Sequence, residues 1–297
     1  MNRHRLLVLL APLLLLVGCQ QKPAPPKLHY VVGPPYQAGG VWRYPQADFA
    51  YDATGIAGIE TGPHAPYTAD GERYSADAFA AASPTLQLPA IARITNLENG
   101  QQIVVRVNDR GPESPARLIA VTPRVARLLG FDADGTARVR VQILPGPSQQ
   151  IAFSLPGGPT LAIARAPIGA VAVSTLPPPG STSAAAPAPT PAAQPAAPAP
   201  AAAPAAFPPD EQPGARSAVP PNPGAIWVRA GLFTDQQYAA LQAAALARFA
   251  PAMVPRYGGG TFRVEVRIGP FASVAAADGV LNEVLRAGVN GASLVVE

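Results

Sequence analysis

The chain has 297 residues, enough for two small domains with connecting segments, and 38 of these residues are prolines while only 13% are charged. This composition predicts that part of the chain is not globular. The formal net charge is +4, but removal of Arg3 and Arg5 with an export signal leaves 20 basic against 18 acidic residues. No stripe of Lys and Arg interleaved with aromatic residues is present, so we expect no nucleic-acid partner.

Potential metal ligands are few and scattered. Cys19 is the single cysteine, which excludes an internal disulfide, and the three histidines, His4, His29 and His64, are widely separated. No group of His, Cys and Asp has the spacing of a metal site. The sequence therefore predicts neither a bound metal nor a cofactor.

The N-terminus carries an export signal. Basic residues at positions 3–5 precede the apolar run Leu6–Val17, which at about 12 residues is too short to span a bilayer but typical of a signal-peptide core. The run continues into LVGC, ending at Cys19, and resembles the lipobox of bacterial lipoproteins. The resemblance implies that residues 1–19 are a signal peptide and that Cys19 is lipidated, which anchors the chain to a membrane. Gln20 after the cysteine implies the outer membrane, with the protein facing the periplasm.

Residues 20–49 are expected to be a tether and residues 50–147 a globular domain of short strands. Two alternating stretches, 91–96 and 101–108, flank Asn99-Gly100, which predicts a hairpin with a type I′ turn. Asp109 follows the second strand and precedes a turn at Gly111-Pro112. A carboxylate in this position is predicted to lie at the mouth of a barrel.

The remainder of this domain fits a closed β-barrel. Further strands are predicted at 117–121 and 136–144, where apolar and polar residues alternate. Between them Thr122 is a candidate N-cap, Pro123 a first helical residue and Gly130 a stop signal for a short helix.

Residues 148–223 are predicted to be a disordered linker. Positions 177–223 are rich in Pro and Ala, with three charged residues among them. A segment of this kind cannot bury enough apolar surface to offset the entropy of ordering it.

Residues 224–297 are predicted to form a compact second domain. Strands are expected at 226–229, 262–268 and 292–296, with helices at 235–249 and after Ser273. Gly231-Leu232-Phe233 and Gly269-Pro270-Phe271 lie 38 residues apart, each before a helix, which indicates a ferredoxin-like βαβ-βαβ arrangement.

This repeat resembles the SPOR domains that bind septal peptidoglycan stripped of stem peptides. The chain departs from that family at Arg229, where a Gln is usual. An RNA-binding RRM has the same topology, but it needs paired aromatic residues on its sheet, which are missing here.

The run VRVNDRGP, preceded by TNLENG and by YTADGERY at positions 67–74, resembles the double-psi barrel of the rare lipoprotein A family. The fold class expected is thus mainly β plus α+β: a double-psi β-barrel, a disordered linker and a SPOR domain. The resemblance implies lytic transglycosylation, in which the C6 hydroxyl of muramic acid displaces N-acetylglucosamine and closes an anhydro ring without water.

One carboxyl can serve as acid to the leaving oxygen and then as base to the hydroxyl, and burial suits it to this by raising its pKa. Asp109 is the candidate for this role, and Glu72 matches a second family carboxylate. Arg110, Asn108 and Ser83 are the candidate glycan-binding residues.

Two positions depart from the family in ways that bear on activity. Ser83 stands where the family has a His, and serine cannot relay a proton near neutral pH as imidazole does. Ala120 stands where the family has an Asp. His64 is a candidate replacement for the imidazole, although its surroundings predict a loop.

The sequence leaves three functions open. The first is an endolytic transglycosylase that acts on peptide-free glycan at the division septum. The second is a non-catalytic peptidoglycan-binding lipoprotein, and the third an expansin-like loosener of the wall. In each, the partners are peptidoglycan glycan strands, the membrane through Cys19 and possible division proteins.

Overall fold

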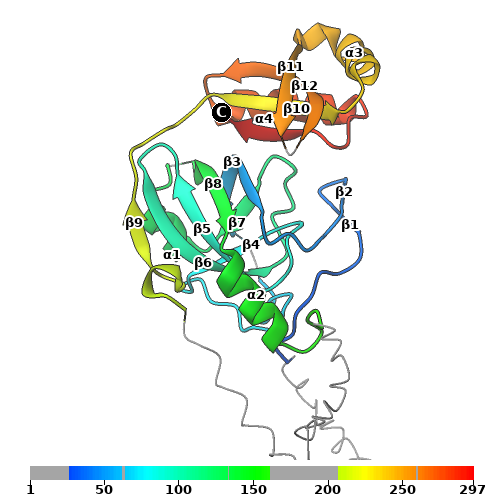
Figure 1. Cartoon of the computed structure of the whole chain (residues 1–297). Coiled ribbons are helices and arrows are strands. Elements are labelled where there is room, and N and C mark those ends of the chain that lie inside the picture. The colour runs from blue at the N-terminus through cyan, green and yellow to red at the C-terminus, as the bar shows by residue number, and fades with distance from the viewer. Residues whose placement is uncertain (1–26, 62–63, 133, 161–206, 259) are drawn as a thin grey trace, which may run out of the picture.

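The computed structural model describes residues 27–61, 64–132, 134–160, 207–258 and 260–297. Cys19 and most of the Pro/Ala-rich segment lie outside these ranges. Within them, no helix is both long enough and apolar enough to cross a bilayer. The chain forms a strand-rich lower domain and a smaller C-terminal domain above it in Figure 1.

The lower domain is a closed β-barrel, as predicted, and the structure gives it six strands. Its order is β4-β7-β3-β8-β5-β6, and an additional β4–β6 pairing closes it. The pairs β3/β7 and β4/β6 are parallel and the others antiparallel. The strands are β3 (Asp52–Ile59), β4 (Ala80–Ala82), β5 (Ala90–Asn96), β6 (Gln101–Asp109), β7 (Ile119–Val121) and β8 (Thr136–Ile143).

Alternation in the sequence becomes the barrel core. Ile103, Val105 and Val107 of β6 are buried and pack with residues of β5 and β8. The β5–β6 hairpin forms as predicted, but its turn is not type I′, because only Gly100 has a positive φ, of 76°, and not Asn99. The loop is longer than two residues, and the Gly100 amide donates to the Asn96 carbonyl.

The helix α1 (Pro123–Leu129) agrees with the sequence prediction. Gly130 ends it with a φ of 67°, and the buried face carries Val125, Ala126 and Leu129. Thr122 precedes it, but its hydroxyl donates to the Ala78 carbonyl and does not cap the helix. Thr122 therefore joins the helix start to the segment before β4.

The predicted linker boundaries are wrong at both ends. The helix α2 (Pro145–Ser154) packs Ile151 against Ile91 and Val104 of the barrel. Beyond residue 206, a short 3-10 turn (Pro209–Glu211) is followed by β9 (Arg216–Ala218), which pairs with the start of β6. The proline content concealed these segments, because helices accept proline in the first turn and edge strands tolerate it.

The predicted tether at 20–49 also contains ordered structure. Strands β1 (Tyr36–Ala38) and β2 (Val41–Arg43) form a hairpin beside the barrel, and Val31 forms a bridge with Leu88. The described part of this segment is therefore a layer on the barrel rather than a spacer.

The C-terminal domain has the ferredoxin-like topology that the repeat predicted. Its sheet order is β11-β12-β10-β13, with every pair antiparallel, and the two helices pack on the sheet. Strand β11 was missed because it contains Pro255, which an edge strand accommodates. The elements are β10 (Ile226–Phe233), α3 (Gln236–Ala245), a 3-10 turn (Ala247–Phe249), β11 (Ala252–Gly258), β12 (Thr261–Phe271), α4 (Val274–Arg286) and β13 (Ser293–Val296).

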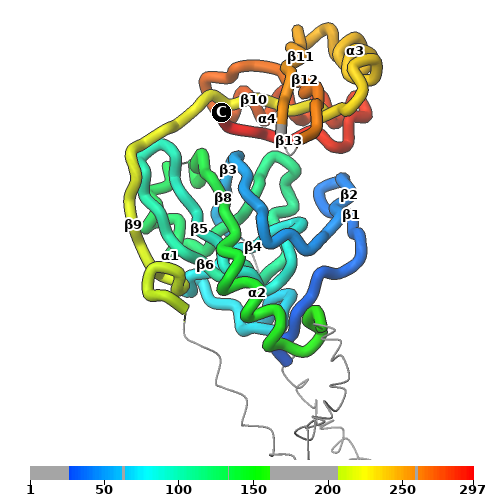
Figure 2. Tube along the Cα trace, in the orientation of Figure 1, coloured from blue at the N-terminus to red at the C-terminus, as the bar shows by residue number. Residues whose placement is uncertain are grey.

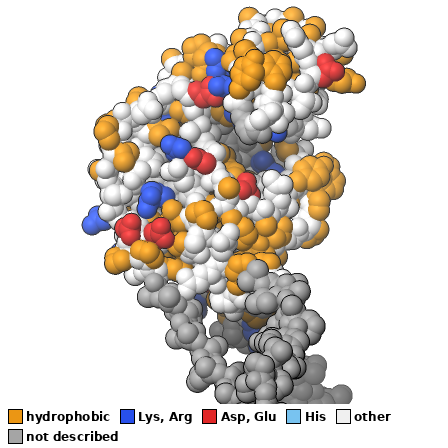
Figure 3. Space-filling model, in the orientation of Figure 1, with side chains coloured by type: hydrophobic (Ala, Val, Ile, Leu, Met, Phe, Trp, Pro, Cys, Tyr) orange, Lys and Arg blue, Asp and Glu red, His pale blue; other side chains and the backbone are white. Residues whose placement is uncertain are grey.

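The two domains are in contact, as the trace in Figure 2 shows. Nη1 and Nη2 of Arg117 each donate to the Asp278 carboxylate at 2.9 Å, and the Thr54 hydroxyl donates to the Val296 carbonyl. Ile56 of β3 is fully buried in the core of the C-terminal domain. On the face drawn in Figure 3, acidic and basic side chains are interspersed and form no continuous basic stripe.

Candidate functional site at the barrel rim

Strand pairing places Asp109 at one end of the barrel. It is the last residue of β6, its Cα is paired with that of Ala82, and its carbonyl accepts from the Ser83 amide. Gly111, with a φ of 152°, turns the chain away immediately afterwards. The predicted position of Asp109 at a strand end before a turn is confirmed.

The Asp109 carboxylate is fixed through one of its two oxygens. Its Oδ1 accepts from the amides of Ala69, at 2.9 Å, and of Arg110, at 2.8 Å. Oδ2 accepts no hydrogen bond from any residue that the structure describes. Asp109 is partly exposed, so it caps the turn and still has one oxygen available for a proton.

Glu72 is held by two neighbours on β6. The Arg106 Nε lies 2.6 Å from its Oε1, and the Asn108 amide donates to its Oε2 at 2.7 Å. Asn108 is only 6% exposed. The expectation that Asn108 binds glycan is therefore replaced by a role in positioning Glu72.

Beneath Glu72 lies a fully buried carboxyl, Asp70. Its Oδ1 accepts from the Thr68 hydroxyl and from the Glu72 amide, while Oδ2 has no partner among the described residues. Burial raises the pKa of Asp70 to about 6. Asp70 therefore shapes the turn that presents Glu72.

Arg110 and Ser83 hold the chain rather than face a ligand. The Arg110 guanidinium donates to the carbonyls of Val32, Ser83 and Leu86, so it joins the N-terminal segment to the loop after β4. Ser83 is 3% exposed, and its hydroxyl accepts from the Leu86 amide at 3.2 Å. These contacts do not support the prediction that Arg110 and Ser83 bind glycan.

Glu60 is the residue that sequence reasoning missed. It follows β3, and its amide donates to the Val121 carbonyl. The pKa of Glu60 is raised to about 7, mainly by burial and also by the negative charge of Asp109, while a hydrogen bond with Tyr74 opposes both. The signal in the sequence that could have identified Glu60 is its position as a charged residue directly after a buried strand.

His64 lies on the loop that leads to Tyr74. The two rings stack with centroids 4.0 Å apart and planes 19° apart, and His64 is exposed. The loop prediction for His64 is confirmed. The ring packs on Tyr74 beside Glu60 and does not take the place of Ser83.

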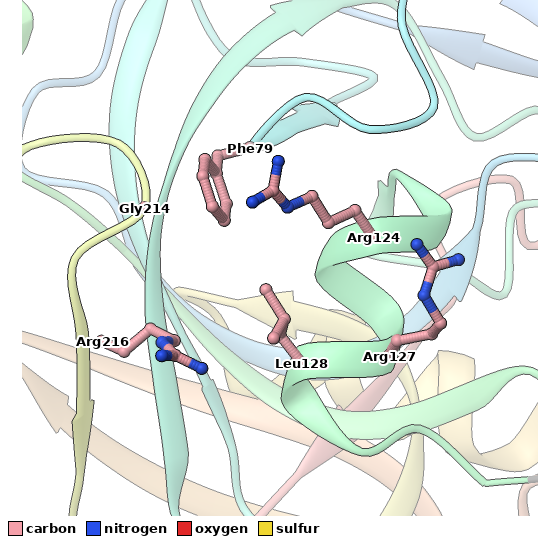
Figure 4. Close-up of a pocket in the computed structure, with 6 residues that line it drawn as sticks. All are labelled: Phe79, Arg124, Arg127, Leu128, Gly214 and Arg216. Atoms are coloured by element: carbon pink, nitrogen blue, oxygen red, sulfur yellow. The ribbon is translucent and has the colours of Figure 1, made fainter.

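A hollow of about 400 Å³ lies beside α1, and none of these carboxylates lines it. Figure 4 shows the Arg124 guanidinium against the Phe79 ring, 4.1 Å from its centroid. The other lining residues are Arg127, Leu128, Gly214 and Arg216.

In the described ranges, no group of three or more His, Cys, Asp or Glu residues is arranged to hold a metal ion. The rim itself carries the carboxyls of Asp109 and Glu60, a third carboxyl, Glu72, held by Arg106, and the phenol of Tyr74.

Comparison with known proteins gives this rim a context. Residues 53–141 match the family model described as lytic transglycolase. The barrel is thus similar to that family over almost all of its strands. The match covers Asp109 at the end of β6, Glu60 directly after β3 and the loop that carries Glu72, and it ends before the C-terminal domain.

The barrel domain is also similar to proteins named endolytic peptidoglycan transglycosylase RlpA. The relative from Neisseria meningitidis serogroup A is 42% identical over 129 residues, which are 42% of this chain and 54% of the relative. That from Rickettsia felis is 34% identical over 128 residues, covering 42% and 56%. That from Pseudomonas aeruginosa strain UCBPP-PA14 is 44% identical over 110 residues, covering 36% and 32%. The chain thus spans about half the length of the first two of these relatives and about a third of the length of the last.

Proposed function

We propose that this protein is an endolytic peptidoglycan lytic transglycosylase. It cleaves the bond between N-acetylmuramic acid and N-acetylglucosamine and leaves a 1,6-anhydro-muramyl end. The observation that carries the proposal is the placement of Asp109 at the rim of a lytic transglycolase barrel, with Oδ1 held by two amides and Oδ2 without a partner among the described residues.

The reaction requires two proton movements and no water. The glycosidic oxygen takes a proton as its bond to C1 breaks, and the C6 hydroxyl gives one up as its oxygen bonds to C1. Asp109 is the group that exchanges a proton with the substrate, through Oδ2. Glu72, fixed by Arg106 and Asn108, supplies a second oriented carboxylate for the sugar hydroxyls.

The remaining expectations extend the proposal to the whole protein. The lipobox-like sequence supports lipidation at Cys19 and attachment to the outer membrane on the periplasmic side. The ferredoxin-like C-terminal domain supports a SPOR-type role, in which the domain binds peptide-free septal glycan and delivers it to the barrel. Division proteins are further candidate partners.

A second candidate, a non-catalytic glycan-binding lipoprotein, is favoured by one observation. Ser83 and Ala120, which replace a family His and Asp, are both buried and offer no titrating group. In that case the barrel holds glycan without cleaving it.

The test is product formation by the chain from residue 20 onward, made without lipid. The protein is incubated with peptide-free glycan strands, and mass spectrometry measures anhydro-muramyl ends. We expect product from the wild type and none from Asp109→Ala. Absence of product from a folded wild type that still binds the strands would favour the non-catalytic candidate.

A further inference from the structure

Two carboxyls lie at the same end of the barrel although they are far apart in sequence. Asp109 is paired with Ala82, Ala82 with Ala120, and the next β7 residue, Val121, with Ile59. The row crosses four adjacent strands and ends beside Glu60, which follows Ile59. Ala82 and Ala120 are small and Val121 and Ile59 are apolar, so the row holds no charged side chain between the two acids.

The surroundings of Glu60 differ from those of Glu72, the other glutamate at the rim. The titratable groups that act on it are Asp109, from the end of β6, and Tyr74, from the loop before β4. Glu60 forms no ion pair with any residue that the structure describes, whereas Glu72 is paired with Arg106. The nearby Arg110 guanidinium is turned onto backbone carbonyls.

We propose that Glu60 is a second catalytic carboxyl, the proton donor to the leaving glycosidic oxygen, and that Asp109 accepts the proton of the C6 hydroxyl. This inference rests on the proposed function and divides its two proton movements between two groups. The bond from C1 to the glycosidic oxygen breaks as the bond from C1 to O6 forms. One proton leaves Glu60 and one arrives at Asp109, and transfer from Asp109 back to Glu60 restores the starting state.

The pair explains how the barrel works without the family imidazole. Histidine is suited to proton transfer because it titrates near neutral pH. Burial and the neighbouring negative charge raise the pKa of Glu60 to about 7, so this carboxyl titrates in the same range. Asp109, whose Oδ1 is occupied by two N–H groups, is the natural acceptor through Oδ2.

A structural role for Glu60 predicts different behaviour from a catalytic one. If Glu60 only anchors Tyr74, removing the phenol hydroxyl affects stability and leaves the pH profile in place. If Glu60 is the acid, activity falls as pH rises through its pKa. The Tyr74 hydrogen bond lowers that pKa, so its removal moves the alkaline limb to higher pH.

The experiment measures kcat and KM for anhydro-end formation between pH 5 and 9 with the unlipidated chain from residue 20. The variants are Glu60→Gln and Tyr74→Phe, with Glu283→Gln as a matched control on the exposed surface of α4. We expect Glu60→Gln to lower kcat by about 100-fold or more with KM within about two-fold. Tyr74→Phe should shift the alkaline limb upward, and the control should behave as wild type.

The outcomes separate the two proposals. A wild type without product overturns the proposed function and this inference with it. An active wild type, together with a Glu60→Gln variant of similar rate and pH profile, overturns only the assignment of Glu60. If Glu60→Gln does not fold, an unshifted alkaline limb in Tyr74→Phe overturns the assignment on its own.

Discussion

Two glutamates of this chain, Glu60 and Glu265, lie in very different electrostatic surroundings. Glu265 in β12 is 1% exposed and lies between Arg229 of β10 and Arg256 of β11. Burial alone raises its pKa, but the bonds from the two arginines outweigh that effect, and the pKa of Glu265 is lowered. Glu60 forms no ion pair with an arginine in the part of the chain that the structure describes, and its pKa rises to about 7. A paired arginine therefore keeps Glu265 ionised and in a structural role, whereas Glu60, which lacks such a pair among the described residues, is able to donate a proton.

The same contrast accounts for Arg229, the departure from the SPOR pattern. Its Nε donates to Glu265 at 2.9 Å, so the arginine compensates a buried charge that a neutral Gln would leave partly unpaired. The replacement of Gln by Arg at position 229 therefore has a structural explanation within this sheet.

The largest expected effect comes from substitution of Asp109 at the barrel rim. Asp109→Asn keeps an oxygen that accepts from the amides of Ala69 and Arg110, so we expect the free energy of unfolding to stay within about 1 kcal/mol of wild type. The rate of anhydro-end formation should fall by about 1000-fold, because an amide cannot exchange the proton. Urea unfolding and a product assay on the same sample make the comparison. A loss of activity that is matched by an equally large loss of folding stability would contradict a catalytic role.

Glu265→Gln should show the opposite pattern. Removing the buried charge leaves Arg229 and Arg256 without their common partner, and we expect the C-terminal domain to lose about 2 kcal/mol of stability, since both arginines are partly exposed. Activity on soluble glycan per folded molecule should be retained. Unchanged thermal unfolding would show that the ion pairs do not stabilise this sheet.

Asp70→Asn tests the effect of burying a carboxyl that forms no ion pair among the described residues. Because the pKa of Asp70 is raised to about 6, its protonated form is favoured on folding. The stability that it contributes is full below about pH 4 and is lost as pH rises through 6. The Asn variant lacks this loss, so its stability relative to wild type should increase by about 2 kcal/mol between pH 4 and 7. Chemical unfolding at several pH values measures the difference, and a flat difference would count against the burial.

The smallest effect is expected from Arg229→Gln, which installs the residue usual in SPOR domains. Arg256 still pairs with Glu265, so we expect a loss of about 1 kcal/mol. Calorimetry checks this value. A loss as large as that of Glu265→Gln would mean that Arg229 alone carries the compensation.

Local patterns in the sequence were sufficient for much of the fold. Alternation located β5, β6 and β8, and Thr122, Pro123 and Gly130 bounded α1, because these features depend on residues close in sequence. Asp109 was placed correctly for the same reason. Strand β11 and helix α2 were missed because each contains proline at a position that only an edge strand or a first helical turn permits.

The site was less accessible to sequence reasoning because it is assembled sideways across strands. Glu60 meets Asp109 only through the β3–β7–β4–β6 pairing, which no local pattern reveals. Ser83 and Arg110 were assigned to glycan from their place in a motif. Their hydrogen bonds to backbone groups instead fix the loop after β4.

The most direct test of the account is the origin of the oxygen at the new chain end. Peptide-free glycan strands are digested by the unlipidated wild-type chain in water enriched in ¹⁸O, and the products are examined by mass spectrometry. Because O6 of muramic acid is the nucleophile, we predict 1,6-anhydro ends that carry no ¹⁸O. Reducing ends labelled with ¹⁸O would show hydrolysis and contradict the account.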